Sequence, residues 1–332
     1  MVLFPNTIQE VFTSRCTRVR TMLQRRYPHQ IRLGQTWADG VFYAKDLVRE
    51  ARSLMNCEDV KEVSSERNVF LGLMLPKEGQ TDLESRYLIY FQPKIDMRDG
   101  SLMGAEALAR AVDQEGNIIP PARFIEELEE TGEIRELDFF MLESALRQLS
   151  EWKTQGFAPV HVSVNISRKT LFNPTTLASV LAIQSHYPEI PPEQVDLEIT
   201  ETAGDVERAT LADVVNSFGE YGICFELDDF GSHYANMAVF SSIRFHTVKL
   251  DRSLISDLPD NAISRMLIEN IANICRNFGM ECVAEGVETR QQEAALLKAG
   301  CICGQGYYYD RPLPPQKFEE KYLRTDKRQG VM

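Results

Sequence analysis

The chain of 332 residues is poor in several features that would assign it to a common class of protein. It has no apolar run near the roughly 18 to 20 residues of a membrane span and no signal-peptide pattern at its start, which predicts a cytoplasmic protein without a membrane segment. Basic residues are outnumbered, since 36 Lys and Arg face 49 Asp and Glu. The formal charge of −13 argues against a DNA or RNA polymer as partner. A small phosphorylated ligand remains compatible, because a bound metal masks local negative charge.

Cysteine and histidine are scattered rather than clustered. The seven cysteines include a C-x-C at Cys301 and Cys303 with no second pair at zinc spacing, and we interpret them as reduced thiols. The five histidines show no pairing at ligand spacing and are interpreted as structural or surface residues. The motifs G-x-x-x-x-G-K-[ST], G-x-S-x-G and H-E-x-x-H are all absent from the sequence.

What the chain has instead is a series of strand-like apolar runs that end in acidic or polar residues. Asp and Glu are depleted from strands and costly to bury without a partner, so their recurrence at strand after strand predicts a cation among them. A divalent metal is the simplest such cation. The segments are GAEALAR with Glu106, VSVNIS with Asn165, LEITET with Glu198 and Glu201, ELDDFG with Asp228 and Asp229, TVKLDR with Lys249, and VAEGVET with Glu285 and Glu288.

Strand-like and helix-like segments alternate from Arg86 onward, which predicts an α/β fold of the TIM-like (β/α)8 barrel type. The connection PKIDMRDGS after the first strand is too short for a helix and contains a turn signal, so the first strand should run antiparallel to the second. The acids then fall at the carboxyl ends of the strands, where barrel enzymes build active sites. The strand-like runs are 87–92, 102–108, 160–166, 195–200, 223–229, 246–250, 281–287 and 305–309, and the helix-like runs are 121–130, 134–155, 174–185, 205–221, 262–278, 290–299 and 314–324.

The first 85 residues do not show this alternation of strand-like and helix-like segments. The segment 74–84 has the Pro, Gly and charge content of a linker. We therefore expect an N-terminal α+β segment at 1–80 and a barrel domain at 86–325.

Each strand-end segment also has an ordinary structural interpretation. The pairs Glu198/Glu201 and Glu285/Glu288 fit one metal ligand with one orienting carboxylate, or a solvated loop pair. Adjacent Asp228 and Asp229 fit a carboxylate that bridges two metal ions, or a turn leading into a glycine.

Asn165 and Lys249 are the neutral and basic members of the series. The amide oxygen of Asn165 is a hard ligand suited to Mg²⁺ or Mn²⁺, although a lone Asn is usually a turn residue. Lys249 beside several carboxylates fits a charged group that positions water, or a salt bridge to Asp251 or to a strand-end acid.

Seven ordered segments closely resemble the motifs of the EAL-domain cyclic di-GMP phosphodiesterases, and the signature tripeptide is Glu106-Ala107-Leu108. The resemblance covers about 86–325. It implies a barrel with one antiparallel strand, a homodimer, and hydrolysis of cyclic di-GMP to linear pGpG with two Mg²⁺ or Mn²⁺ ions per active site. The segments are 90–110, 162–167, 197–202, 226–231, 248–252, 283–289 and 304–314.

The resemblance also implies roles for individual residues. Glu106, Asn165, Glu198 and Asp228 correspond to ligands of the first metal, and Asp228 with Asp229 to ligands of the second. Glu285 corresponds to the general base or water-orienting acid, with Lys249 as its partner at the attacking water. Glu201 and Glu288 correspond to organisers of the metal ligands, and Gln92, Arg110 and Gln305 to contacts with the dinucleotide.

One loop departs from the family pattern. The family usually has D-D-F-G-T-G-Y-S-S, whereas residues 228–236 are DDFGSHYAN, with His233 in place of a glycine. A histidine is costly wherever that glycine has a positive φ. The change puts catalytic rate and regulation in question more than metal binding. It favours an alternative function, an EAL module that binds cyclic di-GMP or a partner protein without useful turnover. A barrel enzyme for another phosphodiester is a third hypothesis, with little support given Gln92, Arg110 and Gln305.

Residues 1–80 faintly resemble the closing third of a GGDEF diguanylate cyclase domain, in a chain that lacks the G-G-D-E-F signature. Such a remnant would act as a cap or regulatory lever. An unrelated helical leader is the competing interpretation.

Overall fold

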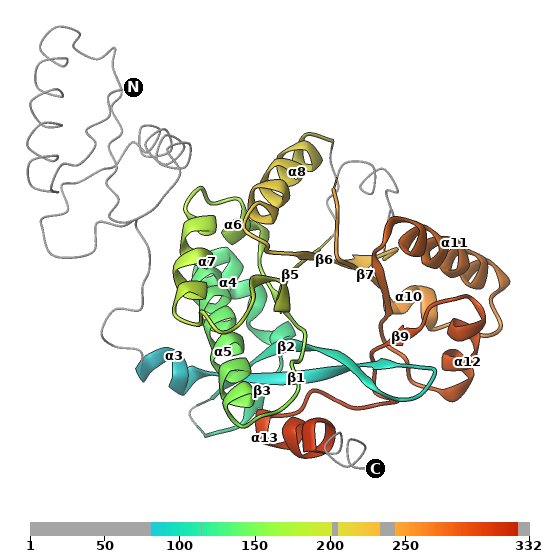
Figure 1. The fold of residues 1–332 in the computed structure, drawn as a ribbon, viewed down its shortest axis with the longest axis horizontal. Helices are drawn as coiled ribbons and strands as arrows, with labels where there is room; N and C mark the ends of the chain where they lie inside the picture. The colour runs from blue at the N-terminus through green and yellow to red at the C-terminus, as the bar shows by residue number, and fades with distance from the viewer. Residues whose placement is uncertain (1–80, 114, 201–204, 233–242, 325–332) are drawn as a thin grey trace, which may run out of the picture. The chain divides into compact units, whose positions relative to one another are not determined.

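The computed structural model describes residues 81–113, 115–200, 205–232 and 243–324 (Figure 1). The chain divides into two units, Met1–Leu75 and Pro76–Met332, and all described residues belong to the second. The predictions for residues 1–80, for Glu201 and for the loop at His233 therefore lie outside the described residues.

The described part of the chain contains a nine-stranded sheet that closes into a barrel between β1 and β2, with β3 attached to β2. Its order is β1-β9-β8-β7-β6-β5-β4-β2-β3, and the additional pairing of β1 with β2 completes the circle. The strands from β4 to β9 run parallel, as expected for alternating strands and helices. Their bounds are β1 Tyr87–Asp96, β2 Leu102–Val112, β3 Ile118–Ile119, β4 Val162–Asn165, β5 Val195–Thr200, β6 Phe225–Phe230, β7 Thr247–Leu250, β8 Glu281–Ala284 and β9 Cys303–Gly304.

The prediction of an antiparallel first strand is confirmed. Strand β1 pairs antiparallel with β2 and with β9. The hairpin between β1 and β2 turns at Gly100, whose φ of 79° lies in the left-handed region. The amide of Gly100 donates to the carbonyl of Asp96 at 2.8 Å, and the Asp99 side chain accepts from the amide of Ser101 at 2.9 Å. These local bonds explain why a short sequence sufficed to predict the reversal.

Helices follow most strands and lie around the outside of the barrel (Figure 1). The predicted helix at 121–130 is divided into a 3₁₀ turn and α4, and the one at 314–324 into α13 and a π turn. The predicted strand at 305–309 is wrong: β9 lies earlier, and Tyr309 closes a turn by donating from its amide to Gly306. The bounds are α3 Thr81–Arg86, η1 Pro121–Arg123, α4 Ile125–Thr131, α5 Ile134–Thr154, α6 Arg168–Leu171, α7 Thr176–Ser185, η2 Pro192–Gln194, α8 Asp205–Gly219, α10 Arg252–Ile255, α11 Ala262–Phe278, α12 Arg290–Lys298, α13 Pro315–Phe318 and η3 Glu319–Leu323.

Apolar side chains fill the space between barrel and helices. Trp152 on α5 is almost fully buried, with its ring centroid 4.9 Å from that of Phe91 and 5.4 Å from that of Phe318. Burial of such aromatic groups is among the largest single contributions to a core. None of the helices in the described ranges has the length and apolar character needed to cross a bilayer.

The inner face of the barrel is polar. Along β5, Leu197 belongs to the apolar core, whereas its neighbours Asp196 and Glu198 are buried acids. Successive side chains of a strand point to opposite faces, so these two acids share the inner face. Glu226 and Lys249 are likewise only 1% exposed. The barrel therefore buries charge on its inside and apolar surface on its outside.

Candidate active site at the carboxyl end of the barrel

Parallel strands bring the predicted acidic segments to one end of the barrel. Asn165 is the last residue of β4 and pairs in register with Glu198 of β5. Asp228 and Asp229 lie near the end of β6, Lys249 near the end of β7, and Glu285 directly after β8. Glu106 joins them from the middle of β2. Segments far apart in the sequence thus form one cluster, which is the arrangement that the strand-end pattern predicted.

Lys249 lies at the centre of this cluster. Its Nζ is 2.6 Å from Glu285 Oε1 and 3.2 Å from both Glu106 Oε2 and Asp228 Oδ1, and it also pairs with Glu198. Burial opposes the charge, but the surrounding acids outweigh burial and hold the pKa of Lys249 well above its ordinary value. The side chain is therefore a permanently charged ammonium. The salt bridge between Lys249 and a strand-end acid, which the sequence offered as one interpretation, is present, and Lys249 forms it with several acids at once.

Glu106 accepts hydrogen bonds from three side chains. Asn165 Nδ2 donates to Oε1 at 3.0 Å, while Gln305 Nε2 at 2.6 Å and Lys249 Nζ at 3.2 Å reach Oε2. Burial disfavours the carboxylate form, but Lys249 and these donors lower the pKa of Glu106 below its ordinary value. This acid is therefore ionised and held in one orientation.

Asp228 and Asp229 both contribute to the cluster although they are consecutive residues of a strand. The pairing of β6 with β7 shifts register between Leu227 and Phe230. Asp229 has a φ of 55°, which among the described residues makes it the one non-glycine with positive φ. This local break in the strand turns two adjacent carboxylates to the same side, and backbone strain of this kind is concentrated at functional sites.

Asp228, Asp229 and Glu285 each offer an oxygen within 4.8 Å of the others, close enough to share one cation. Burial together with the charge of Asp228 raises the pKa of Asp229 to about 6. Burial, with the charges of Asp228 and Glu106, raises the pKa of Glu285 to about 8 despite the opposing effect of Lys249. Both shifts arise mainly from burial, with a further contribution from the negative charge of the neighbouring acids.

A second charged pair lies beneath the cluster. Lys94 Nζ contacts Glu226 at 2.6 Å and donates to Ser163 Oγ at 3.0 Å, and Ser163 Oγ donates to Glu198 Oε2 at 2.8 Å. Ser163 thus connects the Lys94–Glu226 pair to Glu198 and fixes one oxygen of the Glu198 carboxylate. Sequence reasoning missed Lys94, Ser163 and Glu226, although Glu226 lies two residues before Asp228, on the same strand face.

The residues expected to contact a dinucleotide lie beside Glu106. Gln305 Nε2 is 3.4 Å from Gln92 Oε1, and Gln92 Nε2 donates to the carbonyl of Asp310 at 3.2 Å. The guanidinium of Arg110 lies 5.4 Å from the ring centroid of Tyr90. These side chains extend the cluster along one side with hydrogen-bonding groups.

Glu288 lies differently from the other acids. Its carboxylate is 42% exposed and contacts the guanidinium of Arg252 at 2.7 Å. The structure thus directs Glu288 to a surface ion pair, whereas Glu285, three residues earlier, reaches the cluster.

The donor set fits hard divalent cations. Carboxylate and amide oxygens are the preferred ligands of Mg²⁺ and Mn²⁺. The cluster has five carboxylates and a single ammonium, which contacts four of them, so added positive charge would be stabilised. The residues that could hold such ions are Glu106, Asn165, Glu198, Asp228, Asp229 and Glu285.

A (β/α)8 barrel with one antiparallel strand and an acidic cluster at its carboxyl end defines the class of this protein. The chain belongs to the EAL domain family, whose model matches residues 80–312. It is 29% identical over 352 residues to the cyclic di-GMP phosphodiesterase PdeR of Escherichia coli, an alignment that covers 99% of this chain and 52% of PdeR. It is also 29% identical over 235 residues to the signaling protein YkoW of Bacillus subtilis, covering 71% of this chain and 29% of YkoW. The chain thus spans about half or less of these relatives.

Solved structures share the fold. The PaMucR phosphodiesterase, in complex with cyclic di-GMP, is 27% identical with a TM-score of 0.65 and covers 71% of this chain and 95% of that one. An EAL domain protein from Listeria monocytogenes is 28% identical with a TM-score of 0.64 and covers 72% of this chain and 93% of that one. These findings carry no support for a GGDEF-type remnant in residues 1–80.

Proposed function

We propose that this protein is a cyclic di-GMP phosphodiesterase that hydrolyses its substrate to linear pGpG with two Mg²⁺ or Mn²⁺ ions. The observation that carries the proposal is the convergence of four carboxylates on the ammonium of Lys249 at the carboxyl end of the barrel, with Asp229 beside two of them. Support also comes from two relatives, the cyclic di-GMP phosphodiesterase PdeR and the PaMucR phosphodiesterase.

The first ion is assigned to Glu106, Asn165, Glu198 and Asp228, and the second to Asp228 and Asp229. Such ions, when bound, neutralise the phosphate and lower the pKa of a coordinated water. The protein holds the metal-binding oxygens in fixed positions. Asn165 and Gln305 donate hydrogen bonds to Glu106, and Ser163 donates one to Glu198. Rigid donors keep their orientation when the ions and substrate bind.

Glu285 is assigned as the proton acceptor, with Lys249 as its orienting partner. The two groups lie 2.6 Å apart, so the ammonium fixes one carboxylate oxygen and leaves the other to accept a proton. The raised pKa of Glu285 would fall when positive charge enters the cluster, since opposite charges favour the ionised form. A base with a pKa near neutral is suited to proton transfer at physiological pH.

Substrate contacts are assigned to Gln92, Arg110 and Gln305. Gln305 is 3% exposed and its Oε1 has no hydrogen-bond partner among the described residues, so this acceptor is available to a ligand donor. The half-buried guanidinium of Arg110 suits a phosphate or guanine acceptor. Glu201 and Glu288 remain proposed organisers of the metal ligands, and Glu106 is proposed as a metal ligand that takes part in catalysis. The proposed assembly is a homodimer.

We further propose the domain division expected from the sequence, an N-terminal segment at 1–80 that regulates a barrel at 86–325. Cytoplasmic localisation is part of the same proposal. The alternative, a module that binds cyclic di-GMP without useful turnover, is favoured by one observation, the altered sequence at 232–236.

The decisive experiment is incubation of the purified full chain with cyclic di-GMP and Mn²⁺, with pGpG followed by chromatography. Asp228→Asn and Glu106→Ala should abolish product formation while leaving the fold intact, because each removes a metal ligand without removing core packing. The exposed His186→Gln serves as a matched control with unchanged activity. Binding of cyclic di-GMP without any product would favour the binding module, and full activity in either ligand variant would contradict the two-metal assignment.

A further inference from the structure

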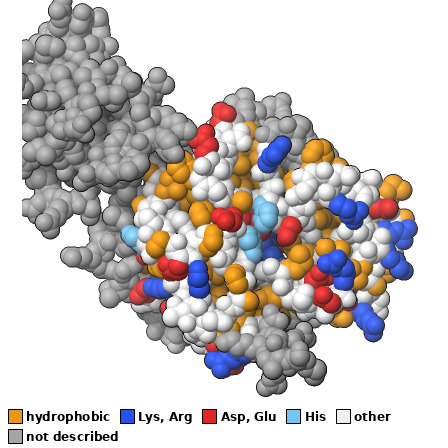
Figure 2. Space-filling model, viewed as in Figure 1, with side chains coloured by type: hydrophobic (Ala, Val, Ile, Leu, Met, Phe, Trp, Pro, Cys, Tyr) orange, Lys and Arg blue, Asp and Glu red, His pale blue; other side chains and the backbone are white. Residues whose placement is uncertain are grey.

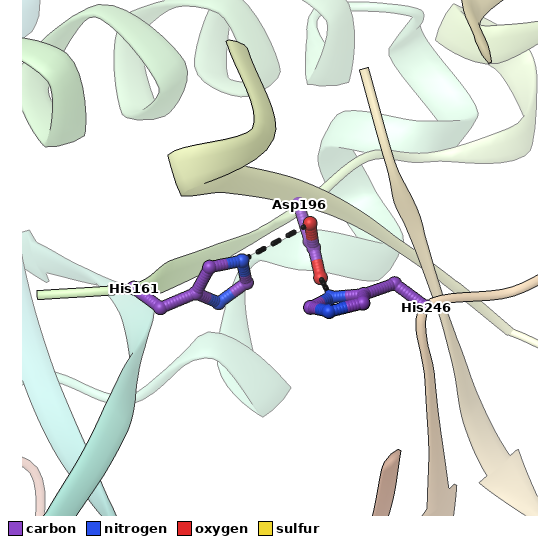
Figure 3. Close-up of side chains that lie close together, drawn as sticks. All are labelled: His161, Asp196 and His246. Atoms are coloured by element: carbon purple, nitrogen blue, oxygen red, sulfur yellow. Dashed lines mark hydrogen bonds and ion pairs between the residues drawn. The ribbon is translucent and has the colours of Figure 1, made fainter. Parts of the chain in front are cut away.

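Figure 3 shows a second cluster of ligand-type side chains, formed by His161, Asp196 and His246. His161 directly precedes β4, Asp196 is the second residue of β5, and His246 directly precedes β7. Parallel strands align their amino ends as they align their carboxyl ends. This cluster therefore lies at the amino end, away from the acids at the carboxyl end.

The three side chains converge closely. Nδ1 of His246 is 2.6 Å from Oδ2 of Asp196, and Nε2 of His161 is 3.4 Å from Oδ1 of the same carboxylate. The two imidazole centroids lie 5.0 Å apart. One ligand atom from each residue falls within 4.8 Å of the others. Figure 3 shows both rings turned toward the carboxylate from either side.

The carboxylate of Asp196 is incompletely satisfied. Asp196 is fully buried, and its Oδ1 accepts no hydrogen bond among the described residues. Nε2 of His161 approaches this oxygen but donates instead to the carbonyl of Glu193, at 3.1 Å. Buried polar atoms without partners are rare and costly in native proteins. A cation seated between the two rings would supply the missing partner.

The donor set determines which cation would bind. Two imidazole nitrogens and one carboxylate oxygen suit borderline divalent metals such as Zn²⁺, whereas Mg²⁺ prefers oxygen ligands. The imidazoles reach solvent, because their side chains are 28% and 37% exposed, so an ion has a route of entry. Histidine side chains gather near the centre of the face shown in Figure 2. We propose that His161, Asp196 and His246 form a structural Zn²⁺ site, with solvent completing the coordination.

Such a site would join strands that are not neighbours. His161 and Asp196 belong to adjacent strands β4 and β5, whereas His246 reaches them across β6. The ion pair Lys94–Glu226 and the hydroxyl of Ser163 lie between this end and the carboxylate cluster. Ser163 donates a hydrogen bond to Glu198 with or without an ion at the amino end. Zn²⁺ at the amino end should therefore stabilise the barrel and leave hydrolysis unchanged.

A metal-free ion cluster is the competing interpretation. Burial opposes ionisation of Asp196, but the hydrogen bond from His246 and the nearness of both imidazoles lower its pKa to about 2. The hydrogen bond to Asp196 in turn raises the pKa of His246. In that case hydrogen bonds and ion pairs, rather than a metal, connect the three side chains, and Zn²⁺ at micromolar concentration would not bind.

The test counts Zn²⁺ sites on the full chain by competition with a chromophoric chelator. An Asp228→Asn/Asp229→Asn background weakens ion binding at the carboxyl end. In that background His161→Gln and His246→Gln should each lose one equivalent of Zn²⁺, with affinity falling more than about 100-fold, since even the partners of metal ligands contribute about 10–100-fold. The exposed His186→Gln and the half-buried Cys224→Ser should retain it. Zn²⁺ should also raise the Tm of the parent and of both controls, but not of the two histidine variants.

Co²⁺ provides an independent readout, because a four-coordinate ion at a Zn²⁺-type site absorbs visible light much more strongly than a six-coordinate ion among oxygen ligands. This strong absorption should appear in the parent and disappear in His161→Gln. Circular dichroism of each variant verifies that the fold is retained. Equal Zn²⁺ stoichiometry in parent and histidine variants, or loss of the ion in Cys224→Ser alone, would overturn the proposal.

Discussion

The two ends of the barrel use the same scaffold to gather opposite kinds of ligand. At the carboxyl end, four carboxylates converge on one ammonium, that of Lys249, and the carboxylate of Asp229 lies next to two of them. At the amino end, one buried carboxylate lies between two imidazoles. The first arrangement has a large excess of negative charge and hard oxygen donors. The second is close to balanced and offers nitrogen. The comparison shows that the strand ends bring the ligand side chains together, while the chemistry of their donor atoms determines which cation they bind.

Charge excess has a functional consequence. Repulsion among clustered acids raises the pKa of Asp229 to about 6 and of Glu285 to about 8, with burial the larger cause. At the amino end the single acid Asp196 has its pKa lowered instead. The acids at the carboxyl end therefore gain most from added positive charge, whereas the acid at the amino end is already held in the ionised form that a metal ligand needs.

The largest expected contrast is in turnover. Glu285→Gln preserves shape and hydrogen bonding but cannot accept a proton, so turnover should fall by roughly 10²–10⁴-fold, as is typical when a general base is removed. Cyclic di-GMP binding should survive, measured with Ca²⁺ as an inert substitute. His161→Gln at the other end should turn over normally. If the Glu285 variant keeps its rate, the base lies elsewhere.

Removal of the central ammonium should destabilise the carboxyl end. Lys249→Met leaves four buried or half-buried acids without their shared partner, and breaking a buried ion pair costs about 3–5 kcal/mol. Urea denaturation in a chelator should show this loss, and Mn²⁺ should restore part of it. The exposed Lys298→Met is the matched control, with little change expected. Equal stability of the two variants would show that Lys249 is not the counter-ion of the cluster.

The layer between the two ends can be tested by single and double replacement. Lys94→Met leaves Glu226 buried without its partner, and the free energy of unfolding should fall by about 3–5 kcal/mol. Adding Glu226→Gln removes the unpaired charge, so the double variant should be more stable than Lys94→Met. Additive losses in denaturation experiments would contradict a direct pairing.

A buried acid outside both clusters gives the smallest effect. Burial raises the pKa of Asp138 on α5 to about 6, although Ser167 donates to it from its amide at 3.0 Å and its hydroxyl at 2.7 Å. The folded state therefore binds the proton more tightly than the unfolded state, and this residue's contribution to stability increases as pH falls through 6. Between pH 8 and pH 5 the gain should be about 1–2 kcal/mol. Asp138→Asn should remove it, as measured by denaturation at both pH values; parallel pH profiles would disprove the assignment.

Much of the fold was predictable because its signals are local. The alternation of strand and helix patterns predicted the barrel, and the hairpin signal around Gly100 predicted the antiparallel first strand. The tyrosine run at 307–309 misled the prediction of the last strand, because aromatic residues favour strands whereas the backbone there forms a turn.

The candidate site was predictable in its membership and less so in its geometry. Strand-end position sufficed to group Asn165, Glu198 and Asp228, since parallel strands end together, whereas Glu106 reaches them from the middle of β2. It did not reveal that Lys249 would contact four acids at once, nor that the backbone at Asp229 would leave the strand geometry. Those features depend on distances across the barrel, which no local pattern encodes.

The sequence by itself determined the alternating elements, the reversal of the first strand and the acids at strand ends, because each follows from periodicity and turn chemistry within a few residues. Only the tertiary structure decided which buried charges meet. Asp196 and His246 are separated by 50 residues, and His161 lies on yet another strand, so the histidines had no pairing at ligand spacing. Closure of the barrel sets all three at one end, because strand register across the sheet fixes distances that sequence separation does not.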